Sequence, residues 1–401
     1  MAFRTLQLDP ADATALLGAV RGLRGGPELL AAVEKNAVPA HLVGGAVRDL
    51  LIGSAPRELD VVVEDDVSGI VAALGGEAVF HERFGTATVT LPGGATVDLA
   101  RARAETYPEP GALPEVEPAP IDIDLHRRDV TLNAIAIDLR SGTVRAAGPA
   151  LEDLDEMRLR VLHPGSFTDD PTRLWRLVRY EVRLGADWDP ITELLARAAV
   201  QSGALRTVSV ARLASELRLA LGEPDPYGAL AAAQRLGLPP QFDLDAVRLE
   251  QTERLGDGLA PHRDLVLAAL ASADPLLPRM LDRKDETTLI DAALLLREPG
   301  TERRPGPLPD TAAGSVIRRR FEGMPLAAIA AAPDAAPAAR WLQELREVRP
   351  LITGDDLLHA GVAAGPALGV GLAAARDAIL DGHVGAHERD AQLKVALSAA
   401  C

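Results

Sequence analysis

The stretch HLVGGAVRDLLIGSAPRELDVVV, residues 41–63, decides how the N-terminal part of the chain is interpreted. An apolar run meets two glycines, Gly44 and Gly45, and a second apolar run ends in three valines. A strand, a turn, a short helix and a second strand account for this order. The glycines let backbone amides approach an anion because no Cβ intervenes. The stretch therefore predicts either an ordinary strand-turn-helix junction or a cradle for phosphate.

Acidic residues at the start of the second apolar run favour the phosphate interpretation over a solvated strand end. Glu58 and Asp60 are two residues apart, so on a strand they point to the same side. Two adjacent carboxylates repel each other unless a divalent cation joins them, and Mg²⁺ binds carboxylate and phosphate oxygens together. Arg48, one helical turn after the glycines, can clamp phosphate oxygens. Asp98, in the run ATVDLARAR, is a candidate for a third carboxylate on a neighbouring strand.

A second group of polar residues lies in DLHRRDVTLNAIAID, residues 124–138. Arg127 and Arg128 can contact phosphate, and Asn133 can hydrogen-bond a sugar. A charged turn before a buried segment is the simpler interpretation of the same residues.

A third group is the run DDPTRLWRLVRYEVRLG, residues 169–185. At about 100° per residue, its arginines fall on one third of a helix and its apolar residues on the opposite half. Charged faces that only meet solvent usually mix the two signs, whereas this row is almost unmixed. The pattern therefore favours a binding role for Arg173, Arg176, Arg179 and Arg183.

The order of periodic segments predicts two kinds of structure along the chain. Strand patterns dominate from residue 41 to about 140, with a hairpin signal at Pro92-Gly93-Gly94, and helical periodicity takes over after about 150. Residues 1–35 are expected to form one or two helices, and the Pro/Gly-rich segment 297–314 a loop. At 401 residues, the chain is expected to form more than one domain.

Composition excludes several classes of protein. No apolar run approaches the roughly 20 residues that span a bilayer, and the N-terminus lacks the layout of a signal peptide. Cys401 is the single cysteine, so a disulfide framework is excluded and a cytoplasmic location, away from membranes, is expected. The net charge of −16 argues against a general nucleic-acid coat, although a local basic stripe can hold RNA.

The three groups, in this order, resemble the motifs of the class II tRNA nucleotidyltransferases, the CCA-adding enzymes, which share their head with bacterial poly(A) polymerases. That family carries G-G-x-V-R-D and D-x-D, then R-R-D-x-x-x-N, then E-D-x-x-R-x-x-R. This sequence offers residues 44–49 and 58–60, then 127–133, then 169–176. Arg212 and Glu216 resemble a following family helix, and residues 352–384 resemble the bacterial C-terminal tail. The likeness is weakest between about 225 and 345.

The resemblance implies an α/β nucleotidyltransferase head with a mixed sheet at 1–148, followed by an all-α remainder. That remainder comprises a neck with the base-reading helix at 149–225, and a body and tail for tRNA binding at 226–401. The implied function is template-independent addition of C and A nucleotides to the 3′ end of tRNA from CTP and ATP.

The family roles carry over to residues of this chain. Glu58 and Asp60 would be catalytic and bind Mg²⁺, Asp170 and Arg173 would read the edge of the incoming base, and Arg176 and Arg179 would support that pair or contact phosphate. The full nucleotide-binding set implied is Gly44, Gly45, Arg48, Arg127, Arg128, Asp129, Asn133, Asp170, Arg173, Arg176 and Arg179.

Three departures from the family pattern leave the exact activity open. Glu58 stands where the family has Asp, and its extra methylene could shift a bound ion by about an angstrom and slow the reaction. Asp169 replaces a Glu. The proline-rich segment 105–125 lacks an Asp-x-Arg lever, which keeps CC-only and A-only addition open. A poly(A) polymerase and a non-enzymatic RNA-binding module with a degenerate active site also stay open. The sequence predicts no oligomeric state.

Overall fold

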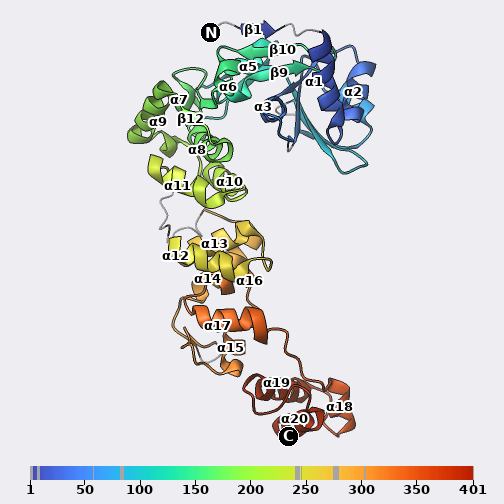
Figure 1. Cartoon of the computed structure of the whole chain (residues 1–401), viewed down its shortest axis with the longest axis vertical. Helices are drawn as coiled ribbons and strands as arrows, with labels where there is room; N and C mark the ends of the chain where they lie inside the picture. Colours follow the sequence, from blue (N-terminus) through green and yellow to red (C-terminus); the bar gives the residue numbers. More distant parts are fainter. Residues whose placement is uncertain are drawn as a thin grey trace. The chain divides into compact units, whose positions relative to one another are not determined.

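The computed structural model describes residues 3–6, 10–56, 58–81, 85–239, 244, 246–273, 280–301 and 304–400. The chain divides into two compact units, Met1–Pro239 and Pro240–Cys401 (Figure 1). The predicted head and neck both lie in the first unit, and the three-part division at residues 148 and 225 stays a prediction.

An eight-stranded mixed sheet forms the centre of the predicted head. The strand order is β1-β10-β9-β2-β3-β6-β5-β4, in which only the β3–β6 pair is parallel. This mixed sheet confirms the predicted fold class. The strands are β1 (Phe3–Leu6), β2 (Ala40–Val43), β3 (Leu59–Val63), β4 (Glu77–His81), β5 (Thr86–Thr90), β6 (Thr96–Arg101), β9 (Ile135–Asp138) and β10 (Val144–Ala147).

Strand β3 is buried on both faces, which explains its continuous run of valines. On one face Val62 joins a core cluster with Ile121 and Leu125 of α5 (Ile121–His126). Val61 and Val63 point to the other face by strand alternation. Buried side chains thus fix the strand that carries Asp60.

Helices α1 (Pro10–Gly22) and α2 (Gly26–Lys35) confirm the expectation for the N-terminal segment. The expectation missed β1, which pairs with β10 at the sheet edge and lies far from it in sequence. The predicted hairpin is confirmed by β5 and β6. Helix α4 (Ser68–Leu74) stops at Gly75, whose φ of 69° is in the left-handed region that favours glycine.

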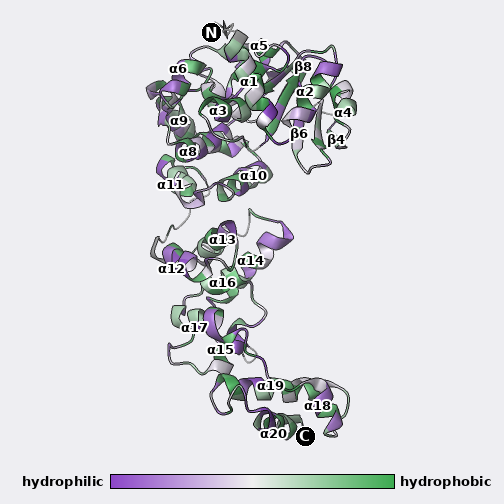
Figure 2. Cartoon of the chain, turned by 45° about the vertical axis from the view of Figure 1, so that its right-hand side comes forward, coloured by the Kyte–Doolittle hydropathy of each residue, from purple (hydrophilic) through white to green (hydrophobic). Residues whose placement is uncertain are grey.

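Helix α8 (Arg173–Leu184) is the central element of the helical part of the first unit and packs against α10 (Val210–Leu221) and α11 (Pro226–Leu236). It carries hydrophilic and hydrophobic residues side by side (Figure 2). Helix α9 (Pro190–Ser202) begins where the side chain of Asp189 accepts hydrogen bonds from two backbone amides. One short parallel pair, β11 (Arg158–Leu159) with β12 (Asp187–Trp188), lies in this part and was not expected from the sequence.

The second unit is helical throughout its described elements. Arg320, in α15 (Gly314–Phe321), is buried and forms an ion pair with Asp334; it also donates to the carbonyls of Leu296 and Pro305. This arginine holds the described part of the predicted 297–314 loop in place. The other α-helices of this unit are α12 (Ala246–Gly256), α13 (His262–Ala273), α14 (Lys284–Leu295), α16 (Leu326–Ala330), α17 (Ala335–Arg340), α18 (Gly354–His359), α19 (Pro366–Leu380) and α20 (Arg389–Ala400), and a short π-helix, η5 (Trp341–Leu345), follows α17. In the part of the chain that the structure describes, no helix has the length and apolar content needed to cross a bilayer.

Candidate active site

The junction between β2 and α3 (Gly45–Leu51) carries the two glycines predicted to cradle phosphate. Gly44 has a φ of 67°, and a Cβ there would lie 2.9 Å from Nη1 of Arg128 and 3.9 Å from Oδ2 of Asp60. The conformation therefore favours glycine, and the Arg128 guanidinium would have to shift to admit a Cβ. Its backbone lies beside an arginine and a carboxylate, which suits a phosphate group held next to a metal ion.

Arg48 of α3 is buried and links the first predicted group of residues to the second. Its Nη1 donates to Oδ1 of Asn133 at 2.7 Å, and its Nε and Nη2 donate to Oδ1 of Asp49 at 2.9 and 2.7 Å. Its guanidinium also lies 5.8 Å from the ring centre of Tyr180 on α8. Residues 85 positions apart in sequence are thereby fixed at one place.

Three carboxylates meet at two neighbouring interior strands of the sheet. Asp60 of β3 and Asp98 of β6 are directly paired across parallel strands, and Glu58 precedes β3 by one residue. One carboxylate oxygen from each lies within 4.8 Å of the others. Oγ1 of Thr88, on β5, donates to Oδ1 of Asp98 at 2.5 Å and orients that side chain. Asp98 thus joins the two carboxylates named by the sequence motif.

The electrostatics of Asp60 fit a metal ligand. Burial raises its pKa; Arg128 opposes this rise, and the carboxylates of Glu58 and Asp98 add to it, giving a pKa of about 6. A divalent cation bound by the three carboxylates would offset both the cost of burying the negative charge of Asp60 and the repulsion among the three groups. The cluster therefore suggests dependence on a divalent metal.

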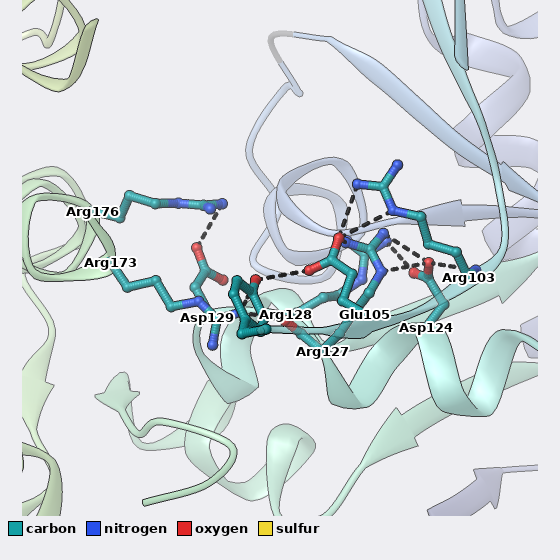
Figure 3. A network of polar contacts seen from close by, with 9 residues as sticks. Arg103, Glu105, Asp124, Arg127, Arg128, Asp129, Arg173 and Arg176 are labelled. Atoms are coloured by element: carbon teal, nitrogen blue, oxygen red, sulfur yellow. Dashed lines mark hydrogen bonds and ion pairs between the residues drawn. The ribbon is translucent and has the colours of Figure 1, made fainter. Parts of the chain in front are cut away.

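A polar network joins the second predicted group to β7 (Arg103–Thr106), as Figure 3 shows. Arg127 donates to Oδ1 of the buried Asp124 and, through Nη1, to Oε1 of Glu105 at 2.8 Å. Arg128 donates to the other oxygen of Asp124 at 3.0 Å, and Arg103 donates to Oε1 of Glu105. Arg127 and Arg128 are thus each held by a carboxylate and still line the cavity described below.

The buried carboxylate of Asp129 has hydrogen-bond or ion-pair partners on both of its oxygens. Its carboxylate accepts hydrogen bonds from Asn133, from the Val130 amide and from the Tyr180 hydroxyl, and it forms an ion pair with Arg176 at 2.8 Å (Figure 3). Burial alone would raise its pKa, but Arg176 and these hydrogen bonds hold the pKa well below its usual range. Asp129 remains ionised and ties α8 to the sheet.

Asp170 and Arg173, the two residues expected to read the base, are each held by hydrogen bonds to different partners. Asp170 accepts a hydrogen bond from Nη2 of Arg212 at 2.7 Å and another from the Thr172 hydroxyl. Arg173 is buried and donates to Oγ of Ser166 and to the carbonyl of Arg127, both within 2.8 Å. No direct contact joins the two side chains among the interactions of the described residues. Both side chains nevertheless line the same cavity.

Arg173 is also connected to β7 through Tyr107. Its Nη2 lies 3.5 Å from the Tyr107 hydroxyl, which in turn donates to Oε2 of Glu105 at 2.9 Å. Burial and the neighbouring Glu105 raise the pKa of Tyr107 to about 12, against the opposing effect of Arg173. The hydroxyl therefore keeps its proton and remains a donor.

The arginine row of α8 is less exposed than a solvated face would be. Arg179 donates to Glu216 at 2.6 Å and to Glu223 at 3.0 Å, and Arg183 donates to the other oxygen of Glu223. Acidic groups from α10 and its C-terminal end thus hold these two arginines. Arg176 is the more accessible member, with 39% of its side chain exposed.

Most of these groups line one cavity of about 710 Å³ within the first unit. Every residue to which the family motifs assign a catalytic, metal-binding or nucleotide-binding role, from Gly44 to Arg179, is part of its lining. The lining also includes residues that sequence reasoning did not select as site residues: Thr86, Arg103, Glu105, Tyr107, Leu113, Pro114, Tyr180, Arg212 and Leu219. Alternating polar residues in RAETY, at β7, were the signal that could have revealed three of them.

A nucleotidyltransferase is the class of protein that this sheet, its carboxylate cluster and the arginine-lined cavity define. A family model described as the poly A polymerase head domain matches residues 40–160. The CC-adding tRNA nucleotidyltransferase of Deinococcus radiodurans is 35% identical over 348 residues, covering 83% of this chain and 82% of that protein. The chain belongs to the class II tRNA nucleotidyltransferase family, the family of the CCA-adding enzymes.

Two further comparisons differ in extent. The A-adding tRNA nucleotidyltransferase of Geobacter sulfurreducens is 42% identical over 210 residues, which are 50% of this chain and 24% of that protein. The chain thus spans about a quarter of the length of that relative. The solved structure of a CCA-adding enzyme in its apo form II has a TM-score of 0.72 at 24% identity and covers 99% of both chains. This likeness shows that the shared fold extends over nearly the whole chain.

Proposed function

We propose that this chain adds C and A nucleotides to the 3′ end of tRNA, taking them from CTP and ATP without a nucleic-acid template. The observation that carries the proposal is that Glu58, Asp60 and Asp98 lie beside a cavity lined by arginines and by Asp170. The names of the family relatives support tRNA as the acceptor. A cytoplasmic location, expected from the sequence, is part of this proposal.

The triphosphate of the incoming nucleotide is assigned to the glycine end of the cavity. The backbone of Gly44 and Gly45 lines the cavity there without a Cβ, and the guanidinium groups of Arg48 and Arg128 supply positive charge. Arg127, Asp129 and Asn133 shape the neighbouring wall, since the hydrogen bonds that hold them fix its outline.

The reaction forms a bond between the 3′-oxygen of the RNA and the α-phosphorus of the nucleotide. The bond from that phosphorus to the oxygen bridging to the β-phosphate breaks, pyrophosphate leaves, and the hydroxyl proton passes to solvent. Glu58, Asp60 and Asp98 would hold Mg²⁺, which would neutralise charge on the attacking and leaving oxygens. The arginines of the cavity hold the leaving pyrophosphate in position.

Base selection is assigned to Asp170 and Arg173. A carboxylate accepts hydrogen bonds and a guanidinium donates them, so the pair matches the donor and acceptor edges of both cytosine and adenine. Arg176 and Arg179 support the pair through α8, and the contacts of Arg179 with Glu216 and Glu223 favour a structural part in that support.

A CC-adding enzyme is the second candidate function. It is favoured by the Deinococcus relative of that name, which matches this chain over most of its length. Segment 105–125, where the family choice is expected to lie, contains β8 (Glu115–Pro118) paired with β7, and both Glu105 and Tyr107 line the cavity.

The test uses the whole purified chain and tRNA transcripts that end at the discriminator base, at C or at CC. Each is incubated with Mg²⁺ and CTP, ATP or both, and the 3′ ends are sequenced. CCA from the mixture supports the proposal, and a stop at CC selects the second candidate. Addition of A only to transcripts ending in CC selects an A-adding enzyme, and an open-ended adenylate tail a poly(A) polymerase. No incorporation under any condition would contradict the proposal and favour a non-enzymatic RNA-binding module.

A further inference from the structure

A straight row of directly paired residues crosses four neighbouring strands from the candidate metal site to the sheet edge. Asp60 pairs with Asp98, Asp98 with Thr88, and Thr88 with Val79 of β4. Directly paired residues lie on the same face of a sheet. The side chains of Thr88 and Val79 therefore extend the face that carries the two carboxylates. Val79 lies about 10 Å from Asp98 because adjacent strands are about 4.8 Å apart.

This face is covered over one half of the sheet and accessible over the other. Over β3 the side chain of Val62 is buried under α5. Over β4 and β5 the paired positions are exposed or only partly covered: Val79 is 59% exposed, Thr90 is exposed, and Thr86 and Thr88 are half-buried. We call the face formed by Val79, Thr86, Thr88 and Thr90 the threonine face. Thr86 also lines the catalytic cavity, so the two surfaces are continuous.

The carboxylate cluster has different neighbours on its two sides, and the proposed reaction requires the leaving group and the attacking hydroxyl to lie on opposite sides. On the β2 side lie Gly44 and Arg128, which are assigned to the triphosphate; on the β5 side lies the threonine face. In an in-line displacement the attacking oxygen approaches from the side opposite the leaving group. The acceptor 3′-hydroxyl must then arrive from the β5 side.

We propose that the threonine face is the binding site for the 3′-terminal nucleotides of the RNA acceptor. This proposal rests on the proposed function and adds the acceptor site to it. Threonine hydroxyls can hydrogen-bond ribose hydroxyls and phosphate oxygens, and the methyl groups of Val79 and the threonines can contact a base or sugar. Arg103, which lines the cavity beside this face, adds positive charge. The acidic residue Glu77 lies one row away, opposite Thr90.

Two substitutions on β4 distinguish a local effect on RNA binding at the threonine face from a general effect of added negative charge. Val79→Glu places a carboxylate on the threonine face, whereas Ala78→Glu places one on the opposite face of the same exposed strand, since Ala78 pairs with the buried Val89. Repulsion of RNA phosphates by Val79→Glu is expected to raise KM for the RNA about five- to tenfold at low salt, and less at high salt. KM for CTP should stay within about twofold of wild type, and Ala78→Glu should resemble wild type in both.

A cross-linking experiment tests the same surface without turnover. The photoreactive residue p-benzoylphenylalanine is placed at position 79 or 78, and labelled tRNA ending at CC is added without any nucleoside triphosphate. Cross-links from position 79 should map to the last nucleotides, and position 78 should give few. Equal RNA KM values for the two glutamate variants, or position-79 cross-links mapping away from the 3′ end, would overturn the proposal.

The outcome is separable from that of the proposed function. The proposed function would be overturned, and the acceptor site supported, if the wild-type chain binds tRNA but adds no nucleotide while the chain labelled at position 79 cross-links to the 3′ end. Should Val79→Glu fail to fold, Val79→Ser and the cross-links decide the question.

Discussion

The carboxylate of Asp170 accepts a hydrogen bond from Nη2 of Arg212 at 2.7 Å, while Nη1 of the same guanidinium donates to the carbonyl of Gly111 at 2.7 Å. One arginine of α10 thus fixes both the proposed base-reading carboxylate and the backbone of segment 105–125. Arg173, named beside Asp170 by the motif, is held instead by Ser166 and by the carbonyl of Arg127. The orientation of Asp170 therefore depends on a residue 42 positions away.

Arg212→Lys should impair the choice of nucleotide more than binding of RNA. Lysine keeps the charge but lacks the planar guanidinium whose two separate nitrogens reach the carboxylate and the carbonyl, so Asp170 loses its fixed orientation. Loss of a charged hydrogen bond predicts an approximately tenfold fall in discrimination of CTP and ATP against UTP and GTP. The measurement is kcat/KM for each nucleotide, with KM for tRNA as the second readout. Arg197→Lys, at an exposed pair on α9, is the control; unchanged discrimination in Arg212→Lys would contradict the role.

Asp60→Ala should abolish nucleotide addition while the chain stays folded. Removing one acid from the cluster of Glu58, Asp60 and Asp98 takes away a ligand of the proposed metal, and positioning errors of this kind cost at least about a hundredfold in rate. Single-turnover addition to tRNA measures the effect, and circular dichroism checks the fold. The exposed Asp65, beyond the end of β3, gives the control Asp65→Asn. A variant that keeps more than about a tenth of the rate would refute the metal assignment.

Glu58→Asp should preserve or increase activity. The shorter side chain restores the residue type that the family motif carries, and Glu58 is exposed just before β3, so its exchange disturbs no core packing. Rates measured across a Mg²⁺ titration would show the change as a lower metal requirement or a higher maximal rate. A large loss of activity would mean that the site has adapted to the longer side chain.

Asp129→Asn should destabilise the first unit, by about 1–3 kcal/mol at neutral pH, because it removes a buried charge paired with Arg176. The pKa of Asp129 is lowered on folding. Its stabilisation is therefore complete above the unfolded carboxyl value of about 4 and declines as pH falls below that value. The difference in free energy of unfolding between wild type and variant should shrink accordingly in urea titrations at pH 7, 4 and 3. The exposed Asp187 gives the control Asp187→Asn, and a difference independent of pH would exclude this account.

The order of motifs was enough to predict the mixed α/β head, the helical remainder and about half of the residues that line the cavity. The roles of Gly44 and Asp60 depend on local geometry. A glycine before a helix allows close approach of the backbone, and a carboxylate on a short strand points to a fixed side, whichever strands pair with them. The amphipathic pattern of α8 likewise predicted that its arginines share one face, and Arg173 and Arg176 both line the cavity.

Contacts between distant segments were not predictable from those patterns. β1 is a strand because β10 offers it an open edge, although nothing in its four residues distinguishes it from the start of a helix. The row of α8 arginines looked free in sequence, but glutamates from α10 and Glu223 neutralise two of them.

By itself, the sequence determined the types of elements and the chemistry carried by each motif, because periodicity, glycine conformation and carboxylate spacing are local properties. Only the tertiary structure decided which groups pair. It placed Asp98 beside Asp60, set Arg212 on Asp170, and left the half of the sheet around Val79 accessible. Strand register and helix packing make these choices, since they depend on burial of surfaces from segments far apart in the chain.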